Sequence, residues 1–134
     1  FIVKALKDKN FDVIKYIVIP DDSSAIEKLL MKYSDVFALN IIVTAGGTGL
    51  SHRDVTPEAT RNVIEKEITG IAEGSRAYGQ RRTPLSMLSR GVAGIRGTSL
   101  IINIPGSLRA VSESLDFLFP GLEHALKMIE GYGH

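Results

Sequence analysis

The sequence predicts an α/β protein with a mostly parallel sheet, helices on both of its faces (three layers, α/β/α) and a small antiparallel hairpin. Two observations support this fold class. Apolar, β-branched runs of strand length alternate along the chain with apolar residues at helical spacing, which is the order of a doubly wound sheet. Residues 38–44 are almost continuously apolar, as expected for a parallel strand buried on both faces. With 134 residues, the chain suits one domain, residues 1–134.

Composition narrows the class of protein. The chain is 44% hydrophobic and 23% charged, which is typical of globular domains. No apolar run reaches the roughly 20 residues of a membrane span, and 16 basic residues nearly balance 15 acidic ones, so we expect neither a membrane nor a nucleic acid as partner. Without cysteine there is no disulfide framework and no thiolate metal site, and no signal-peptide pattern opens the chain. The expected location is the cytoplasm.

The first third of the chain predicts a helix, a strand and a second helix. Residues 1–10 have the pattern of a helix body without a cap, which indicates that further chain precedes it. The β-branched run at 12–19 predicts a strand, and residues 20–22, Pro-Asp-Asp, predict the turn that ends it. Ser24 and Glu27 form a capping box for the second helix. The apolar stripe of that helix comprises Ile26, Leu29, Leu30 and Tyr33.

A glycine-rich loop, TAGGTGLSHRDVTPEAT at 44–60, directly follows the strand at 38–44. Thr56 and Pro57 predict the N-cap and first residue of the next helix. A loop that joins a strand to a helix in this way lies where α/β sheets bind ligands, and its amides favour phosphate. The loop glycines permit positive φ and close approach of a ligand; they are Gly46, Gly47 and Gly49. A turn that needs glycine for its geometry alone is an equal alternative.

Acidic residues near this loop indicate a cation site. Asp54 follows Arg53 in the loop, and a carboxylate beside a phosphate cradle is explained if Mg²⁺ lies between the two. Asp21 and Asp22 end the preceding predicted strand and therefore fall on the same edge of the sheet. In the alternative, Asp54 caps a loop amide and Arg53 is solvated.

The second half of the chain predicts a bent helix, a hairpin, a buried strand and two further helices. An apolar stripe from Val63 to Ile71 predicts a helix that bends at Thr69-Gly70. Residues 94–97 predict a hairpin turn, and residues 99–104 a strand. Two amphipathic helices follow, one containing Val111, Leu115 and Leu118, the other Leu122, Ala125, Leu126 and Ile129. A cluster of three arginines predicts a solvated face, with the border of a subunit or substrate surface as the alternative: Arg76, Arg81 and Arg82. The scattered histidines, His52, His124 and His134, indicate no nucleophile.

Three stretches carry a family resemblance: TAGGTGLSHRDVTPEAT, MLSRGVAGIRG with SLIINIPGS, and PGLEHALKMIEG. Together they resemble the molybdopterin adenylyltransferase family, which comprises the MogA proteins, their plant homologues and the G domain of gephyrin. The likeness extends over essentially the whole chain. It implies a MogA-like fold and a step of molybdenum cofactor biosynthesis, in which molybdopterin and MgATP give adenylylated molybdopterin and pyrophosphate.

The resemblance also implies roles for individual residues. Asp21 and Asp54 match the two functional aspartates of the family, so we expect them to be catalytic and to handle Mg²⁺ and phosphate. Nucleotide would bind to the amides of Gly46, Gly47, Thr48 and Gly49. Substrate contacts are implied or expected for Arg53, Glu58, Ser89, Arg90, Pro105, Gly106 and Ser107. Glu58 could equally favour the helix dipole, and Arg90, whose fork suits a phosphate, could be a surface residue.

Assembly and alternatives follow from the same resemblance. Family members begin with a strand and an acidic, glycine-rich loop that do not occur after Phe1, so we expect the sheet to lack a central strand and to contain a groove. A homotrimer is implied, with apolar Leu50, Met87 and Leu88 near its surface. A downstream molybdenum-insertion protein is a possible partner. Two alternatives remain: a MoaB-type protein that binds a pterin or nucleotide without adenylylation, and a gephyrin-like scaffold.

Overall fold

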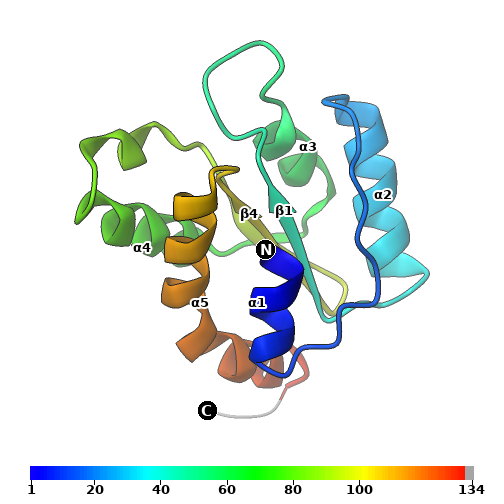
Figure 1. Ribbon diagram of the computed structural model, residues 1–134. Coiled ribbons are helices and arrows are strands. Elements are labelled where there is room, and N and C mark those ends of the chain that lie inside the picture. Colours follow the sequence, from blue (N-terminus) through cyan, green and yellow to red (C-terminus); the bar gives the residue numbers. More distant parts are fainter. Residues whose placement is uncertain (132–134) are drawn as a thin grey trace.

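The computed structural model of the chain describes residues 1–131, so His134 lies outside the described residues. Helices cover both faces of a four-stranded sheet with the order β1-β4-β3-β2, which confirms the predicted α/β class (Figure 1). Strand β1 runs parallel to β4, whereas β3 pairs antiparallel with both β4 and β2. The strands are β1 (Ile41–Ala45), β2 (Lys66–Glu67), β3 (Ala93–Arg96) and β4 (Ser99–Ile104). The helices are α1 (Ile2–Asp8), α2 (Ser23–Asp35), α3 (Thr56–Val63), α4 (Thr69–Gln80), the short 3-10 helix η1 (Pro84–Leu88) and α5 (Leu108–Ile129).

Strand β4 separates two hydrophobic cores. Its residues Leu100, Ile102 and Ile104 are buried in the core that contains α5 and the partly buried faces of α1 and α4. Ile101 is buried with Ile42 on the opposite face, against α2 and α3. Successive side chains of a strand point to opposite faces. The largely apolar sequence of β4 is therefore what a strand between two helix layers requires, and the predicted buried strand is confirmed.

The starts of α2 and α3 differ from the prediction. Asp22, not Ser24, caps α2: its carboxylate accepts the Ala25 N–H at 3.2 Å, and the predicted capping box is wrong. Helix α3 begins one residue earlier than predicted, with Val55 as its N-cap. Val55 provides no side-chain capping hydrogen bond, and the Thr56 hydroxyl lies close to Gly47 of the preceding loop.

A short strand replaces the predicted bent helix between Val63 and Ile71. Helix α3 ends at Val63, and the chain then pairs with β3: the Glu65 N–H donates to the Ile95 carbonyl at 2.7 Å, and the Ile68 N–H to Ala93 at 2.8 Å. Apolar spacing alone did not distinguish a bend from this interruption. The hairpin turn also lies later than predicted, because residues 94–96 belong to β3.

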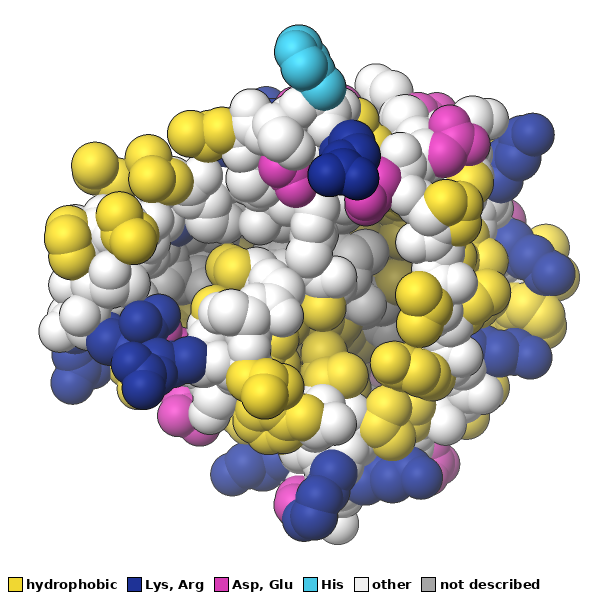
Figure 2. Space-filling view, turned by 45° about the horizontal axis from the view of Figure 1, so that its top comes forward, with side chains coloured by type: hydrophobic (Ala, Val, Ile, Leu, Met, Phe, Trp, Pro, Cys, Tyr) yellow, Lys and Arg dark blue, Asp and Glu magenta, His cyan; other side chains and the backbone are white. Residues whose placement is uncertain are grey.

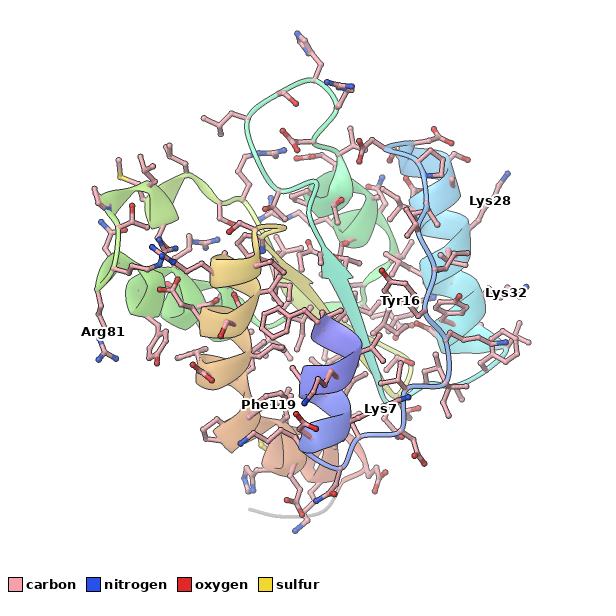
Figure 3. All side chains as sticks on the ribbon, viewed as in Figure 1. Lys7, Tyr16, Lys28, Lys32, Arg81 and Phe119 are labelled. Carbon is pink, nitrogen blue, oxygen red and sulfur yellow. The ribbon has the colours of Figure 1, made fainter. Side chains whose placement is uncertain are left out.

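Helix α5 is one helix where the sequence predicted two. Pro120 lies inside it. A proline removes one hydrogen bond and bends a helix, and α5 changes direction towards its C-terminal end (Figure 1). The Phe119 ring, labelled in Figure 3, stacks on Phe11 at a centroid distance of 6.1 Å. This contact fixes the chain that follows α1 against α5.

Residues 12–19 form no strand, although their β-branched composition predicted one. They run extended beside α2, and a groove of about 700 Å³ separates them from β1. Within residues 1–131, no backbone hydrogen bond joins this segment to β1. A strand needs a neighbour for its N–H and C=O groups, so the prediction failed for lack of a partner. The segment exposes four hydrophobic side chains: Ile14, Tyr16, Ile17 and Val18. Hydrophobic surface, yellow in Figure 2, borders the hollow on its right.

Candidate functional site

The loops that follow β1 and β4 meet at two glycines. Because β1 and β4 are parallel, both loops lie at one edge of the sheet, at the top of Figure 1. The Gly46 N–H donates to the Ile104 carbonyl at 2.9 Å, and Gly46 has φ +95°. A Cβ atom on Gly106 would lie 3.1 Å from the Gly46 Cα. The two predicted strand-to-helix crevices therefore form one site. The two loops can approach each other this closely because Gly46 and Gly106 have no side chains.

Two further glycines are required by packing inside the first loop. Gly47 has φ +70°, and a Cβ atom there would overlap the Thr56 hydroxyl. A Cβ atom on Gly49 would lie 2.9 Å from Oδ2 of Asp54. Geometry alone thus explains Gly47 and Gly49. The loop is consequently drawn tightly against the start of α3.

Helices α3 and α5 both begin at this edge. Ser107 caps α5, and its hydroxyl oxygen accepts the Ala110 N–H at 3.2 Å. At the start of α3, the Thr56 N–H donates to the Gly47 carbonyl at 3.2 Å. The first N–H groups of a helix carry partial positive charge and attract anions. Two helix starts and a glycine loop therefore give this edge the character of an anion site.

Asp54 is held inside its own loop. The amide and the hydroxyl of Ser51 both donate to Asp54 Oδ2, at 2.9 and 2.7 Å. These bonds, first the hydroxyl and then the amide, hold the pKa of Asp54 below its ordinary value, so the carboxylate is charged at neutral pH. Arg53 is exposed. Asp54 thus caps a loop amide, as the alternative interpretation predicted, and it also offers an anionic oxygen to a cation.

Asp21 lies at the same end of the molecule as the glycine loop. It immediately precedes the α2 cap and lines the groove that Gly46, Gly47 and Thr56 also line. The start of α2 and the loop between β1 and α3 are both at the top of Figure 1. Across residues 1–131, no group of three or more acidic, histidine or cysteine side chains is arranged to hold a metal ion.

The structure brings Ser89 and Arg90 to the glycine loop. The Arg90 N–H donates to the Thr48 carbonyl at 2.9 Å, and the Ser89 hydroxyl is 3.5 Å from that of Thr48. The Arg90 guanidinium donates to the carbonyls of Gly49 and Asp54, at 2.8 and 2.7 Å, and to the Glu58 carboxylate. Its hydrogen bonds and positive charge lower the pKa of Glu58. The predicted pair therefore lies at the site, with Arg90 directed at protein acceptors.

Sequence reasoning missed two residues that support the site. Arg76, expected on a solvated face, is half-buried and donates to the carbonyls of Ser89 and Gly91, at 3.2 and 3.1 Å. Arg82 also has a partner, Glu113 at 2.6 Å, whereas Arg81 projects outwards beside Tyr78 (Figure 3). No signal in the sequence distinguishes Arg76 from its neighbours.

The second missed residue is Asn103 in β4. It is buried, its amide nitrogen donates to the hydroxyls of Thr44 and Thr60 at 2.9 and 3.0 Å, and its oxygen accepts the Val92 N–H at 3.2 Å. These bonds join β1, α3 and the start of β3 directly beneath the site. An amide inside an otherwise apolar strand could have revealed it, because buried polar groups need partners.

Residues 1–124 match the family described as "Probable molybdopterin binding domain". The chain belongs to this family. Molybdopterin adenylyltransferase of Helicobacter pylori (strain J99) is 40% identical over 116 residues, which are 87% of this chain and 66% of that protein. The chain therefore spans about two thirds of the length of this curated relative. Family membership associates the chain with molybdenum cofactor biosynthesis.

Solved structures agree with the family assignment. The molybdopterin biosynthesis enzyme MoaB of Thermus thermophilus superposes with a TM-score of 0.90 and 46% identity, covering 97% of this chain and 82% of that one. A MogA structure also gives a TM-score of 0.90, with 38% identity over 96% of this chain and 83% of that chain. The resemblance stated from the sequence is thereby confirmed, as is the MogA-like fold. Along residues 1–131, none of the helices combines the length and the apolar character that crossing a bilayer requires.

Proposed function

We propose that this domain transfers AMP from MgATP to the terminal phosphate of molybdopterin, releasing pyrophosphate. The observation that carries the proposal is the meeting of the two loops at Gly46 and Gly106, beside the starts of α3 and α5. This arrangement brings the glycine loop and two helix starts to one edge of the sheet. Both substrates are polyanions or bear phosphate, so they need such a place to lie side by side. The name of the Helicobacter relative supports the same reaction.

The chemistry requires no protein nucleophile. A phosphate oxygen of molybdopterin forms a bond to the α-phosphorus of ATP, and the bond from that phosphorus to the oxygen bridging to the β-phosphate breaks. Pyrophosphate leaves with the bonding electrons, and no proton needs to move because the attacking oxygen is already ionised. The protein therefore contributes orientation and neutralisation of charge. Asp21 and Asp54 would hold the Mg²⁺ that enters with ATP, and the ion would supply neutralisation of phosphate charge.

The remaining residues of the site divide between the two substrates in this proposal. The amides of Gly47 and Thr48 bind nucleotide phosphates, and Gly46 and Gly49, whose N–H groups donate to Ile104 and Asp54, form the backbone that presents them. The loop after β4 and the exposed Arg53 contact molybdopterin and its phosphate. Ser89 lies beside Thr48, and we assign it to the boundary between the nucleotide-binding and the molybdopterin-binding residues. The residues proposed for substrate contact in the loop after β4 are Pro105, Gly106 and Ser107.

The decisive experiment incubates the protein with molybdopterin and MgATP and follows the AMP-linked product. Asp54→Asn keeps an acceptor for the two Ser51 donors and removes the charge, whereas Asp54→Ala removes both. We expect a strong loss of product from either variant. Asp116→Asn, an exposed position on α5, is the matched control and should keep full activity. Equal product from wild type and Asp54→Asn would refute a catalytic role for Asp54.

A second function is favoured by the MoaB structure, whose identity to this chain is 46%. A protein of this kind could bind the pterin or the nucleotide and leave it unmodified. Wild-type protein would then bind ATP in equilibrium dialysis and form no AMP-linked product. A gephyrin-like scaffold role predicts trimers that show no ATP turnover.

We also propose that the chain assembles as a homotrimer and passes its product to a molybdenum-insertion protein. Hydrophobic side chains project at the left of Figure 2, over the segment that contains η1. The exposed fractions of Leu50, Met87 and Leu88 are 68%, 67% and 41%. Light scattering coupled to size exclusion gives the mass of the assembly, and Met87→Glu should reduce it to that of a monomer.

A further inference from the structure

We infer that Arg90 is a positioning residue: its guanidinium holds both ends of the loop at 49–54, and Arg76 holds the backbone on either side of Arg90. The inference rests on the proposed function, because the loop that is held is the one that would contact the nucleotide. It assigns Arg90 a role other than the phosphate contact that the sequence predicted.

One side chain closes the base of this loop. Arg90 Nε donates to the carbonyl of Gly49 at 2.8 Å, and Nη2 donates to that of Asp54 at 2.7 Å. The residues between these two carbonyls, 50–53, are exposed, and their loop projects from the top of Figure 1. The loop tip thus stands in solvent while its two ends are tied to the same guanidinium. Without that tie, the loop would be shaped from inside by the bonds between Ser51 and Asp54 and by the Arg53 N–H, which donates to the Ser51 hydroxyl at 3.3 Å.

The fork of Arg90 points at Glu58 in the first turn of α3. Nη1 and Nη2 donate to the two carboxylate oxygens, at 2.5 and 3.3 Å. A guanidinium has five N–H groups, and four hydrogen bonds to the protein are formed. The Glu58 charge also repels an anion from this position. Arg90 therefore directs its donors to the loop and to α3, and the phosphate contacts fall to the backbone amides that it holds.

Arg76 fixes the backbone from which Arg90 projects. The Arg76 Nη1 donates to the carbonyls of Ser89 and Gly91, one on each side of Arg90. The Arg76 carbonyl in turn accepts the Ser86 hydroxyl at 2.8 Å. Helix α4 is thereby connected to the glycine loop through two arginines in series. Across residues 1–131, the Arg76 hydrogen bonds reach Ser89, Gly91 and Ser86 and not the loop at 49–54, so Arg76 acts on the loop through the segment that carries Arg90.

The experiment measures binding of inorganic pyrophosphate with Mg²⁺ by isothermal titration calorimetry. Arg90→Lys keeps the positive charge and loses the fork, so it should weaken binding as much as Arg90→Gln, roughly tenfold or more. A phosphate ligand that used the same fork would also bind more weakly with lysine, so the two roles are separated by a change at Glu58. Glu58→Gln distinguishes a positioning role of Arg90 from a phosphate-ligand role, because the two roles predict opposite changes in pyrophosphate affinity. A positioning role predicts weaker binding, whereas a ligand role predicts equal or tighter binding, because a competing negative charge is removed.

Hydrogen exchange tests the inference without any ligand. Arg90→Lys, Glu58→Gln and Arg76→Lys should each accelerate exchange of the amides in the loop at 49–54, while the amides of β4 keep wild-type rates as a sign of intact folding. Arg82→Lys, whose partner is Glu113, is the matched control and should leave the loop unchanged. Unaltered loop exchange in the Arg90 variant would overturn the inference. Absence of pyrophosphate binding by wild type would instead count against the proposed function and leave the exchange result decisive.

Discussion

Gly47 leaves no space for a side chain. Its φ of +70° and the Thr56 hydroxyl beside it both exclude a Cβ atom. Gly47→Ala should lower the free energy of unfolding by about 1–3 kcal/mol and weaken nucleotide binding. The control is Gly121→Ala in α5, where a Cβ atom meets nothing within 4 Å. Urea titration should show equal or greater stability for that variant. Equal stability of the two variants would mean that the loop is not drawn against α3 as described.

The charge of Asp54 depends on Ser51. Hydrogen bonds from Ser51 lower the pKa of Asp54 in the folded protein, so their stabilising effect is complete above the unfolded-state pKa and is lost as pH falls through the folded-state pKa. Ser51→Ala should therefore raise the pKa of Asp54 towards its ordinary value. Carbon-detected NMR titration of the Asp54 carboxyl measures this directly. Ser112→Ala in α5 serves as a control that should leave the titration unchanged.

Strand β4 joins the elements beneath the site through Asn103. Asn103→Leu leaves a buried backbone N–H and two threonine hydroxyls without their partner. We expect a loss of about 2–4 kcal/mol in the free energy of unfolding. Thr98→Ala, in the exposed hairpin turn, should change stability little. Unfolding in urea, followed by circular dichroism, compares the two. A leucine variant as stable as wild type would show that the polar network contributes nothing.

Helices and strands were predictable where a local sequence pattern was sufficient to determine their type and their bounds. The strand at 99–104 was predicted with its observed bounds, because a continuous apolar run matches a strand buried on two faces. The segment 12–19 carried an equally strong pattern and failed, since a strand also needs a neighbour. The stretch from Val63 to Ile71 failed because apolar spacing does not show where a helix gives way to strand pairing. Which strands pair depends on the tertiary structure, and a local sequence pattern does not contain that information.

The sequence predicted which segments form the site, but not which hydrogen bonds connect these segments. Glycines, helix starts and loop aspartates indicated the right edge of the sheet. What Arg90 and Arg76 contact was not predictable, because a basic residue has the same local pattern whether it binds a carbonyl, a carboxylate or a phosphate. Those contacts join segments far apart in the sequence.

At the scale of the molecule, the groove leaves one edge of β1 unpaired. The parallel register and the Gly46 bond to Ile104 direct the N–H groups of Ile42 and Thr44 towards β4, and that of Val43 towards the groove. Hydrogen exchange followed by NMR should therefore be faster at Val43 than at its two neighbours, by roughly tenfold or more. Equal protection of the three amides would show that a partner occupies the groove in solution.

The glycine contact between the two loops sets the order in which the site can assemble. Gly46 and Gly106 come from segments distant in the chain, and they touch only because Ala45 stands opposite Ile104 in the parallel ladder. A slip of one residue would turn every side chain of β1 to the wrong core and pull the glycines apart. The site therefore forms only when β1 and β4 have their native register. During refolding, the ability to bind ligand should consequently appear last.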